Sequence, residues 1–110
     1  MERTDDGRYI ILDGRRWRAT DPELPADVAA ALRRQLMAAR RAVGAALRAH
    51  DSVAEQQARA SVQRAKMALG ERGTPWWEQS SAERRVRWES GLDGPLPELA
   101  RKADATTEQG

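Results

Sequence analysis

LRAHDSVAEQ, residues 47–56, decides how the helical part of this chain folds. It lies between two long stretches with helical periodicity and contains neither glycine nor proline. Ser52 and Glu55 make a capping-box pattern, which predicts that a new helix begins here. The alternative is one continuous helix over residues 26–69, about 65 Å long at 1.5 Å per residue. Because such a rod could not bury its apolar stripe without a partner, an antiparallel helical hairpin is expected.

The two predicted helices cover residues 26–49 and 52–69. A connector with two prolines precedes the first, as is typical before a helix start. Apolar residues then recur at spacings of three and four, which place them on one helix face. They are Val28, Leu32, Leu36, Ala39, Val43 and Leu47. The matching stripe of the second helix consists mostly of small residues, so the two helices are expected to pack closely.

Upstream of the helices, residues 8–19 predict a β-hairpin. YIILDGRRWR, residues 9–18, holds a β-branched and aromatic run followed by the Asp-Gly pair of a type I′ turn. Alternation of side chains places Ile10, Leu12 and Trp17 on one face. An isolated hairpin is marginally stable in water, so this face is expected to dock on the helices.

Downstream, Gly70 stands where the C′ glycine of a helix belongs, and the Thr-Pro pair that follows prevents the helix from continuing. Ser80 with Glu83 repeats the capping-box pattern and predicts a short helix over residues 81–90. Val86 is its clearest apolar position, with Trp88 as a second candidate.

The 110 residues leave room for one domain only. It is expected to span residues 8–90, between a flexible N-terminus (1–7) and a mostly flexible tail (91–110). The predicted fold class is α+β and mainly α: an N-terminal β-hairpin packed on an antiparallel helical hairpin, with a short C-terminal helix. The chain has no Phe and four Trp, so the core should be thin. The residues expected to close it are Trp17, Trp76 and Trp77.

Composition argues against an enzyme. The absence of Cys excludes disulfides and thiolate metal sites, and the single histidine, His50, cannot form a His cluster. Its neighbours Asp51 and Ser52 are too close in sequence to align as a catalytic triad. We therefore expect no catalytic residue, no metal ligand and no cofactor. The chain also lacks an apolar run long enough to span a bilayer and the apolar run of a signal peptide. These features predict a cytoplasmic protein without a membrane partner.

Binding is the expected role. The formal net charge is +2, and the sequence pI is about 9.7 because nearly all the cations are arginine. We predict a non-enzymatic protein-interaction or dimerisation module that acts through an alanine-rich helix face and an exposed tryptophan, a typical interface anchor. The alternative is a nucleic-acid-binding accessory protein that uses the Arg-rich hairpin and helix face. The candidate binding residues are Arg15, Arg16, Arg18, Trp76 and Trp77.

Two segments carry a family resemblance. GRRWRATDP, residues 14–22, and ALGERGTPWWE, residues 68–78, resemble a family of short uncharacterised proteins of high-GC bacteria. Some members bear a Tol-type biopolymer-transport name, which no membrane helix or export signal supports here. In some, a winged-helix-like domain follows, whereas the C-terminal part of this chain is short and different. The resemblance implies that the hairpin and the helix pair form one unit, and it carries over no activity.

Overall fold

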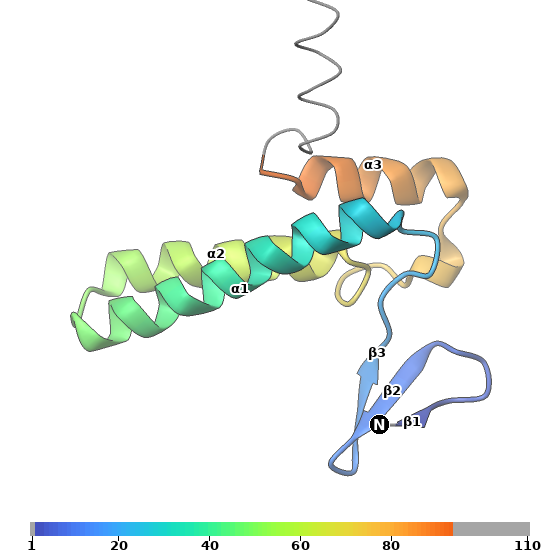
Figure 1. The fold of residues 1–110 in the computed structure, drawn as a ribbon, viewed down its shortest axis with the longest axis horizontal. Coiled ribbons are helices and arrows are strands. Elements are labelled where there is room, and N and C mark those ends of the chain that lie inside the picture. Colours follow the sequence, from blue (N-terminus) through green and yellow to red (C-terminus); the bar gives the residue numbers. More distant parts are fainter. Residues whose placement is uncertain (1, 94–110) are drawn as a thin grey trace, which may run out of the picture.

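The structure is a computed structural model that describes residues 2–93 (Figure 1). Its strands are β1 (Glu2–Arg3), β2 (Tyr9–Leu12) and β3 (Arg15–Arg18). Its helices are α1 (Ala26–Arg48), α2 (Ser52–Ala68), the 3-10 turn η1 (Trp76–Glu78) and α3 (Ser81–Gly91). The expected fold class is confirmed, since a small antiparallel sheet precedes the helices. From residue 94 onward, the expected tail lies outside the described residues.

α1 and α2 form the expected antiparallel hairpin, which extends from the rest of the molecule as an arm (Figure 1). The turn between them is made by His50, whose φ of 54° is left-handed. The predicted cap at Ser52 is wrong by one residue. Asp51 is the N-cap, and its carboxylate accepts a hydrogen bond from the Ala54 N–H at 3.0 Å. An aspartate side chain satisfies a free helix N–H as well as a serine does.

The predicted stripe of α1 is correct over its first half, where Val28, Leu32, Leu36 and Ala39 are buried. Near the tip it fails, because Leu47 is 49% exposed and the smaller side chain before it, Ala46, is buried. Ala46 lies seven residues, about two helical turns, after Ala39 and so keeps to the same face, while Leu47 is rotated by about 100°. Alanines therefore hold the outer half of the arm together.

α3 lies over the inner half of the arm, along the hairpin (Figure 1). The predicted capping box is present: the Ser80 N–H donates to the Glu83 carboxylate at 2.9 Å, and the Glu83 N–H donates to the Ser80 hydroxyl at 3.2 Å. The pKa of Glu83 is lowered by its hydrogen bonds with Ser80, of which the bond to the Ser80 backbone has the larger effect and the bond to the Ser80 side chain the smaller. The prediction that Val86 is the main apolar contact of α3 is wrong, because Val86 is 64% exposed. The second candidate, Trp88, is buried instead.

Close packing of α3 on α2 depends on Gly91. A Cβ atom added at this glycine would lie 2.3 Å from the Ala68 Cβ. Gly91→Ala is therefore expected to lower the free energy of unfolding by about 1–3 kcal/mol, measured by urea denaturation, because α3 must move outward. The control Gly44→Ala lies in the outer half of α1, where an added Cβ would meet only the end of the Arg48 side chain, at 3.4 Å. It should stabilise by about 0.5–1 kcal/mol, and equal losses in both variants would contradict the prediction.

The hairpin at residues 8–19 has the predicted register, with Ile10 opposite Trp17. Its turn residues Asp13 and Gly14 both have positive φ, as a type I′ turn requires. The N-terminus differs from the expectation. Glu2 and Arg3 pair with β2 as a third, antiparallel strand, giving the order β1–β2–β3. Within the expected flexible segment, Glu2 and Arg3 are therefore ordered by pairing, because β2 offers them its second edge.

The face by which the sheet joins the helices is the opposite of the predicted one. Leu12 is 48% exposed and Trp17 is 44% exposed, so neither closes the core. Instead, Tyr9 on the other face meets Trp77 of η1, with ring centroids 5.6 Å apart in an edge-to-face arrangement. Aromatic and arginine contacts at Trp77 hold the sheet, and they leave the face of Ile10, Leu12 and Trp17 uncovered.

Candidate interaction surfaces

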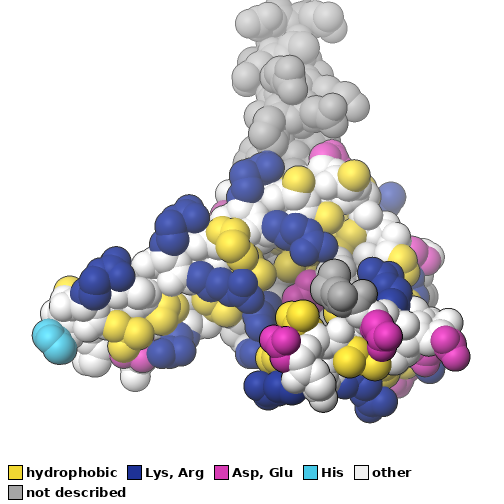
Figure 2. Space-filling view, turned by 60° about the horizontal axis from the view of Figure 1, so that its bottom comes forward, with side chains coloured by type: hydrophobic (Ala, Val, Ile, Leu, Met, Phe, Trp, Pro, Cys, Tyr) yellow, Lys and Arg dark blue, Asp and Glu magenta, His cyan; other side chains and the backbone are white. Residues whose placement is uncertain are grey.

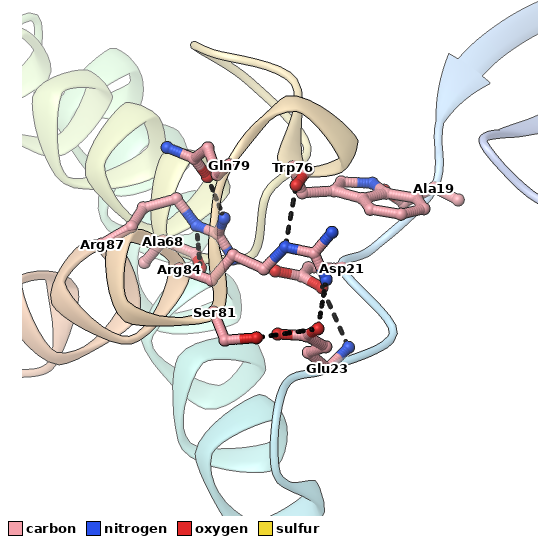
Figure 3. Close-up of polar contacts among 9 residues, drawn as sticks. All are labelled: Ala19, Asp21, Glu23, Ala68, Trp76, Gln79, Ser81, Arg84 and Arg87. Carbon is pink, nitrogen blue, oxygen red and sulfur yellow. Dashed lines mark hydrogen bonds and ion pairs between the residues drawn. The ribbon is translucent and has the colours of Figure 1, made fainter.

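The connector between β3 and α1 is held by a buried carboxylate, Asp21 (Figure 3). This residue is 2% exposed. Its oxygens accept hydrogen bonds from the Arg87 guanidinium at 2.6 Å and from the Glu23 N–H at 2.9 Å, and the Arg84 guanidinium lies at 3.4 Å. A buried charge needs such partners, because an unpaired carboxylate in the interior is strongly unfavourable. Asp21 therefore ties the connector to α3.

Trp76 belongs to the same buried cluster (Figure 3). It is 7% exposed, and its indole N–H donates to the Ala19 carbonyl at 2.9 Å. The guanidinium of Arg84 stacks on the ring at 5.3 Å, and its Nε donates to the Trp76 carbonyl at 2.8 Å. The expectation that Trp76 helps to close the core is met. The ring is therefore not presented to a partner.

The two segments that carry the family resemblance, residues 14–22 and 68–78, fold against each other. The Arg18 guanidinium donates to the Gly73 carbonyl at 2.7 Å, and the Asp21 N–H donates to the Leu69 carbonyl at 3.0 Å. Together with the bond from Trp76, these contacts join the start of the helical hairpin to its end. The two motifs thus have a shared structural role.

Trp77 is half-buried and anchors the sheet. Its ring lies edge-to-face against Trp76 at 5.1 Å. The guanidinium groups of Arg8 and Arg18 lie over it at 4.8 and 5.7 Å. Each such cation–π contact contributes about 0.5–1 kcal/mol at an exposed site. Two of the candidate binding residues, Arg18 and Trp77, are therefore engaged inside the molecule.

The uncovered face of the sheet is the clearest candidate surface. We call it the sheet face. It consists of Arg3, Ile10, Leu12, Arg15 and Trp17, which share one side by the observed register. The Arg15 guanidinium lies over the Trp17 ring at 4.8 Å and the apolar side chains lie beside it. Large apolar side chains left exposed next to one another mark interaction sites.

The five candidate binding residues do not form one site. Arg15 lies on the sheet face, whereas Arg16 is on the opposite face with its guanidinium 4.2 Å from the Tyr9 ring centre. Sequence reasoning missed Leu12 and Trp17 as surface residues because it assigned the larger apolar face to the core. A signal was present: an arginine two positions before Trp17 shares its face and can cover the ring from solvent.

The alanine-rich helix face expected to bind a partner is partly occupied by α3. Toward the tip of the arm it continues as a shallow, open groove between α1 and α2. The lining residues are Ala42, Ala45, Ala46, Ala49, Asp51, Ala54, Gln57, Ala58 and Ser61. Apart from Gln57 and the carboxylate of Asp51, this groove offers only small side chains.

Within residues 2–93 there is no group of three or more His, Asp or Glu side chains placed to hold a metal ion. None of the helices over this range is long and apolar enough to cross a bilayer. No protein-family model matches the chain, and comparisons with curated proteins and with solved structures find no similar protein.

Proposed function

We propose that this chain is a non-enzymatic protein-interaction module that binds an extended, acidic and apolar segment of a partner protein on its sheet face. The observation that carries this proposal is the exposure of Trp17 beside Leu12 on a face of the sheet that the helices leave uncovered. Tryptophan is enriched among the residues that dominate binding energy at protein interfaces.

Charge defines the partner. The two cations of the sheet face, Arg3 and Arg15, flank its apolar side chains, and the one acidic residue of the strands, Glu2, pairs with Ile11 on the opposite face. The surface is thus apolar in the middle and positive at its edges. An acidic segment with apolar side chains complements both properties, since opposite charges favour encounter and fix the orientation of the partner.

The edge of the sheet favours an extended partner. β3 is an edge strand, and the Ala19 N–H donates to the Arg8 carbonyl at 2.8 Å. In an antiparallel ladder, hydrogen-bonded pairs alternate with non-bonded pairs, so the main-chain groups of Arg16 point away from β2. An added strand would pair with these groups and place alternate side chains on the sheet face.

The test is selection of random peptides displayed on phage against the immobilised protein. We expect the enriched peptides to alternate acidic and apolar residues. In fluorescence anisotropy titrations with one enriched peptide, Trp17→Ser should weaken binding at least about tenfold, because the anchor is lost. The control Val86→Ser, which removes an exposed apolar side chain on α3, should leave the affinity unchanged. Peptides without acidic residues, or equal binding by Trp17→Ser, would contradict the proposal.

A second copy of the chain is the rival occupant. If two copies associate through their sheet faces, the molar mass measured by light scattering should double as the concentration of the wild type rises, but not for Trp17→Ser. That result would replace the proposed partner by a homodimer. A constant monomer mass alongside peptide binding supports the proposal as stated.

A further inference from the structure

The arginines of α1 form a second charged surface, separate from the sheet face. This 23-residue helix carries Arg33, Arg34, Arg40, Arg41 and Arg48, and its one acidic residue, Asp27, lies in the first turn. All five arginines are exposed. Figure 2 shows Lys and Arg side chains spread along the arm that α1 and α2 form.

Within the described residues, these arginines lack the ion pairs that the arginines of α2 and α3 make. In the described part of the chain, every ion pair involves Arg59, Arg64, Arg84, Arg85 or Arg87, and none involves an α1 arginine. Among the α1 set, Arg33 donates to the Thr20 hydroxyl at 3.1 Å. Surface arginines with no anionic partner repel one another, so their alignment along one helix leaves a site for an external anion.

Lys66 and Arg72 extend this surface onto α2 and the loop after it. Arg40 and Arg72 line one groove beside α1 and α2. Partial burial, and then the positive charges of Arg72 and Arg40, lower the pKa of Lys66, while Glu71 opposes this shift. The cations therefore lie close enough to repel, and nearby acids do not fully neutralise them. We call the α1 arginines with Lys66 and Arg72 the basic face.

We propose that the basic face binds the phosphate backbone of a nucleic acid laid along the arm. Arg34, Arg41 and Arg48 recur every seven residues, so they form a line about 21 Å long on one side of α1. Measured along the axis of a DNA duplex, each strand places a phosphate every 3.4 Å or so, which allows several contacts over that length. The guanidinium group suits this role because its planar fork binds phosphate oxygens in pairs.

A bilayer is a poorer fit for the same surface. Between the arginines on that side of α1 lie Ala30, Met37 and Gly44, and Met37, 42% exposed, is the one large apolar side chain among them. A single methionine offers little apolar area to insert among lipid chains. An acidic protein would complement the positive charge, but its binding would not require a straight row of regularly spaced arginines. The nucleic acid backbone, with its uniform charge spacing, matches the row best.

The experiment is fluorescence anisotropy of a labelled mixed-sequence DNA duplex of about 20 base pairs, titrated with protein between about 50 and 200 mM salt. Single-stranded DNA and RNA of the same sequence form parallel arms that show which form is preferred. The wild type should bind, with affinity falling steeply as salt rises. Arg34/Arg41→Gln should weaken binding to the duplex at least about tenfold and reduce the salt slope by about 1.8, since each phosphate contact contributes about 0.9.

The matched control is Arg64/Arg85→Gln, which removes the same charge from residues that have surface ion pairs with Asp93 and Glu89. We expect it to weaken binding less than about threefold, because it removes no phosphate contact and only shifts the overall charge.

Absence of binding at low salt, or equal losses in the two variants, would overturn the proposal. Binding to vesicles rich in phosphatidylserine without binding to any oligonucleotide would overturn it in favour of a membrane. Trp17→Ser should bind duplex DNA like the wild type, so this proposal and the sheet-face proposal can fail independently.

Discussion

Replacing Asp21 by alanine should lower the free energy of unfolding by about 3–5 kcal/mol, as expected when one partner of a buried ion pair is removed. The side chains of Arg84 and Arg87 are only 12% and 11% exposed, so each would lose its carboxylate without gaining free access to water. For a domain of this size, such a loss lowers the melting temperature by more than about 10 °C. Thermal and urea unfolding followed by circular dichroism measure it.

Glu23→Ala is the matched control, because Glu23 also pairs with Arg84, at 3.0 Å, but lies at the surface. Exposed ion pairs contribute about 0–1 kcal/mol, so this variant should stay close to the wild type. Asp21→Asn separates charge from shape, since an amide has nearly the same size. If Asp21→Ala costs no more than Glu23→Ala, the carboxylate does not hold the connector as described.

Gly70→Ala is expected to be the second most damaging substitution, lowering the free energy of unfolding by about 2–5 kcal/mol. Gly70 has a φ of 83°, a left-handed conformation that costs a residue with a Cβ about 1–2 kcal/mol. The added methyl would also lie 3.0 Å from the Asp21 Cβ and 3.2 Å from the Trp76 Cδ1. Neither neighbour is free to move, because each is hydrogen-bonded in the buried cluster, and overpacking adds a further 1–3 kcal/mol or so.

Comparison with Gly73→Ala separates the packing cost of Gly70→Ala from its conformational cost. Gly73 has nearly the same φ, 82°, but the atom nearest its added Cβ is the flexible end of Met67 at 3.4 Å. It should therefore show only the conformational cost of about 1–2 kcal/mol. The difference between the two variants in urea unfolding measures how tightly Gly70 is enclosed. Equal losses would mean that the cluster around Asp21 can relax.

The β-hairpin and the three α-helices were predictable because their signals are local. The capping box of Ser80 and Glu83, the Asp-Gly turn of the hairpin and the left-handed glycine at position 70 each involve residues within a few positions of one another. The side-chain alternation of the strands was equally clear. Alternation defines two faces of a hairpin, however, and does not say which one the rest of the chain covers.

The missing information was long-range. Trp17 is larger than Tyr9, so burial alone favoured its face, and nothing nearby in sequence revealed that Trp77 would receive Tyr9 together with Arg8 and Arg18. The role of Asp21 was hidden for the same reason. Its arginine partners follow it by 63 and 66 residues, and a carboxylate beside a proline reads as an exposed turn residue.

That separation has a consequence for how the chain folds during synthesis. The helical hairpin joins segments that are close in sequence, so it can form early, and local contacts of this kind form fast. Asp21 cannot be neutralised until Arg87 has left the ribosome, which happens after both long helices are complete. A nascent chain that ends before α3 can therefore join its sheet to the arm through the contacts of Gly73, Trp76 and Trp77, but the buried carboxylate of its connector still lacks the two arginines that neutralise it.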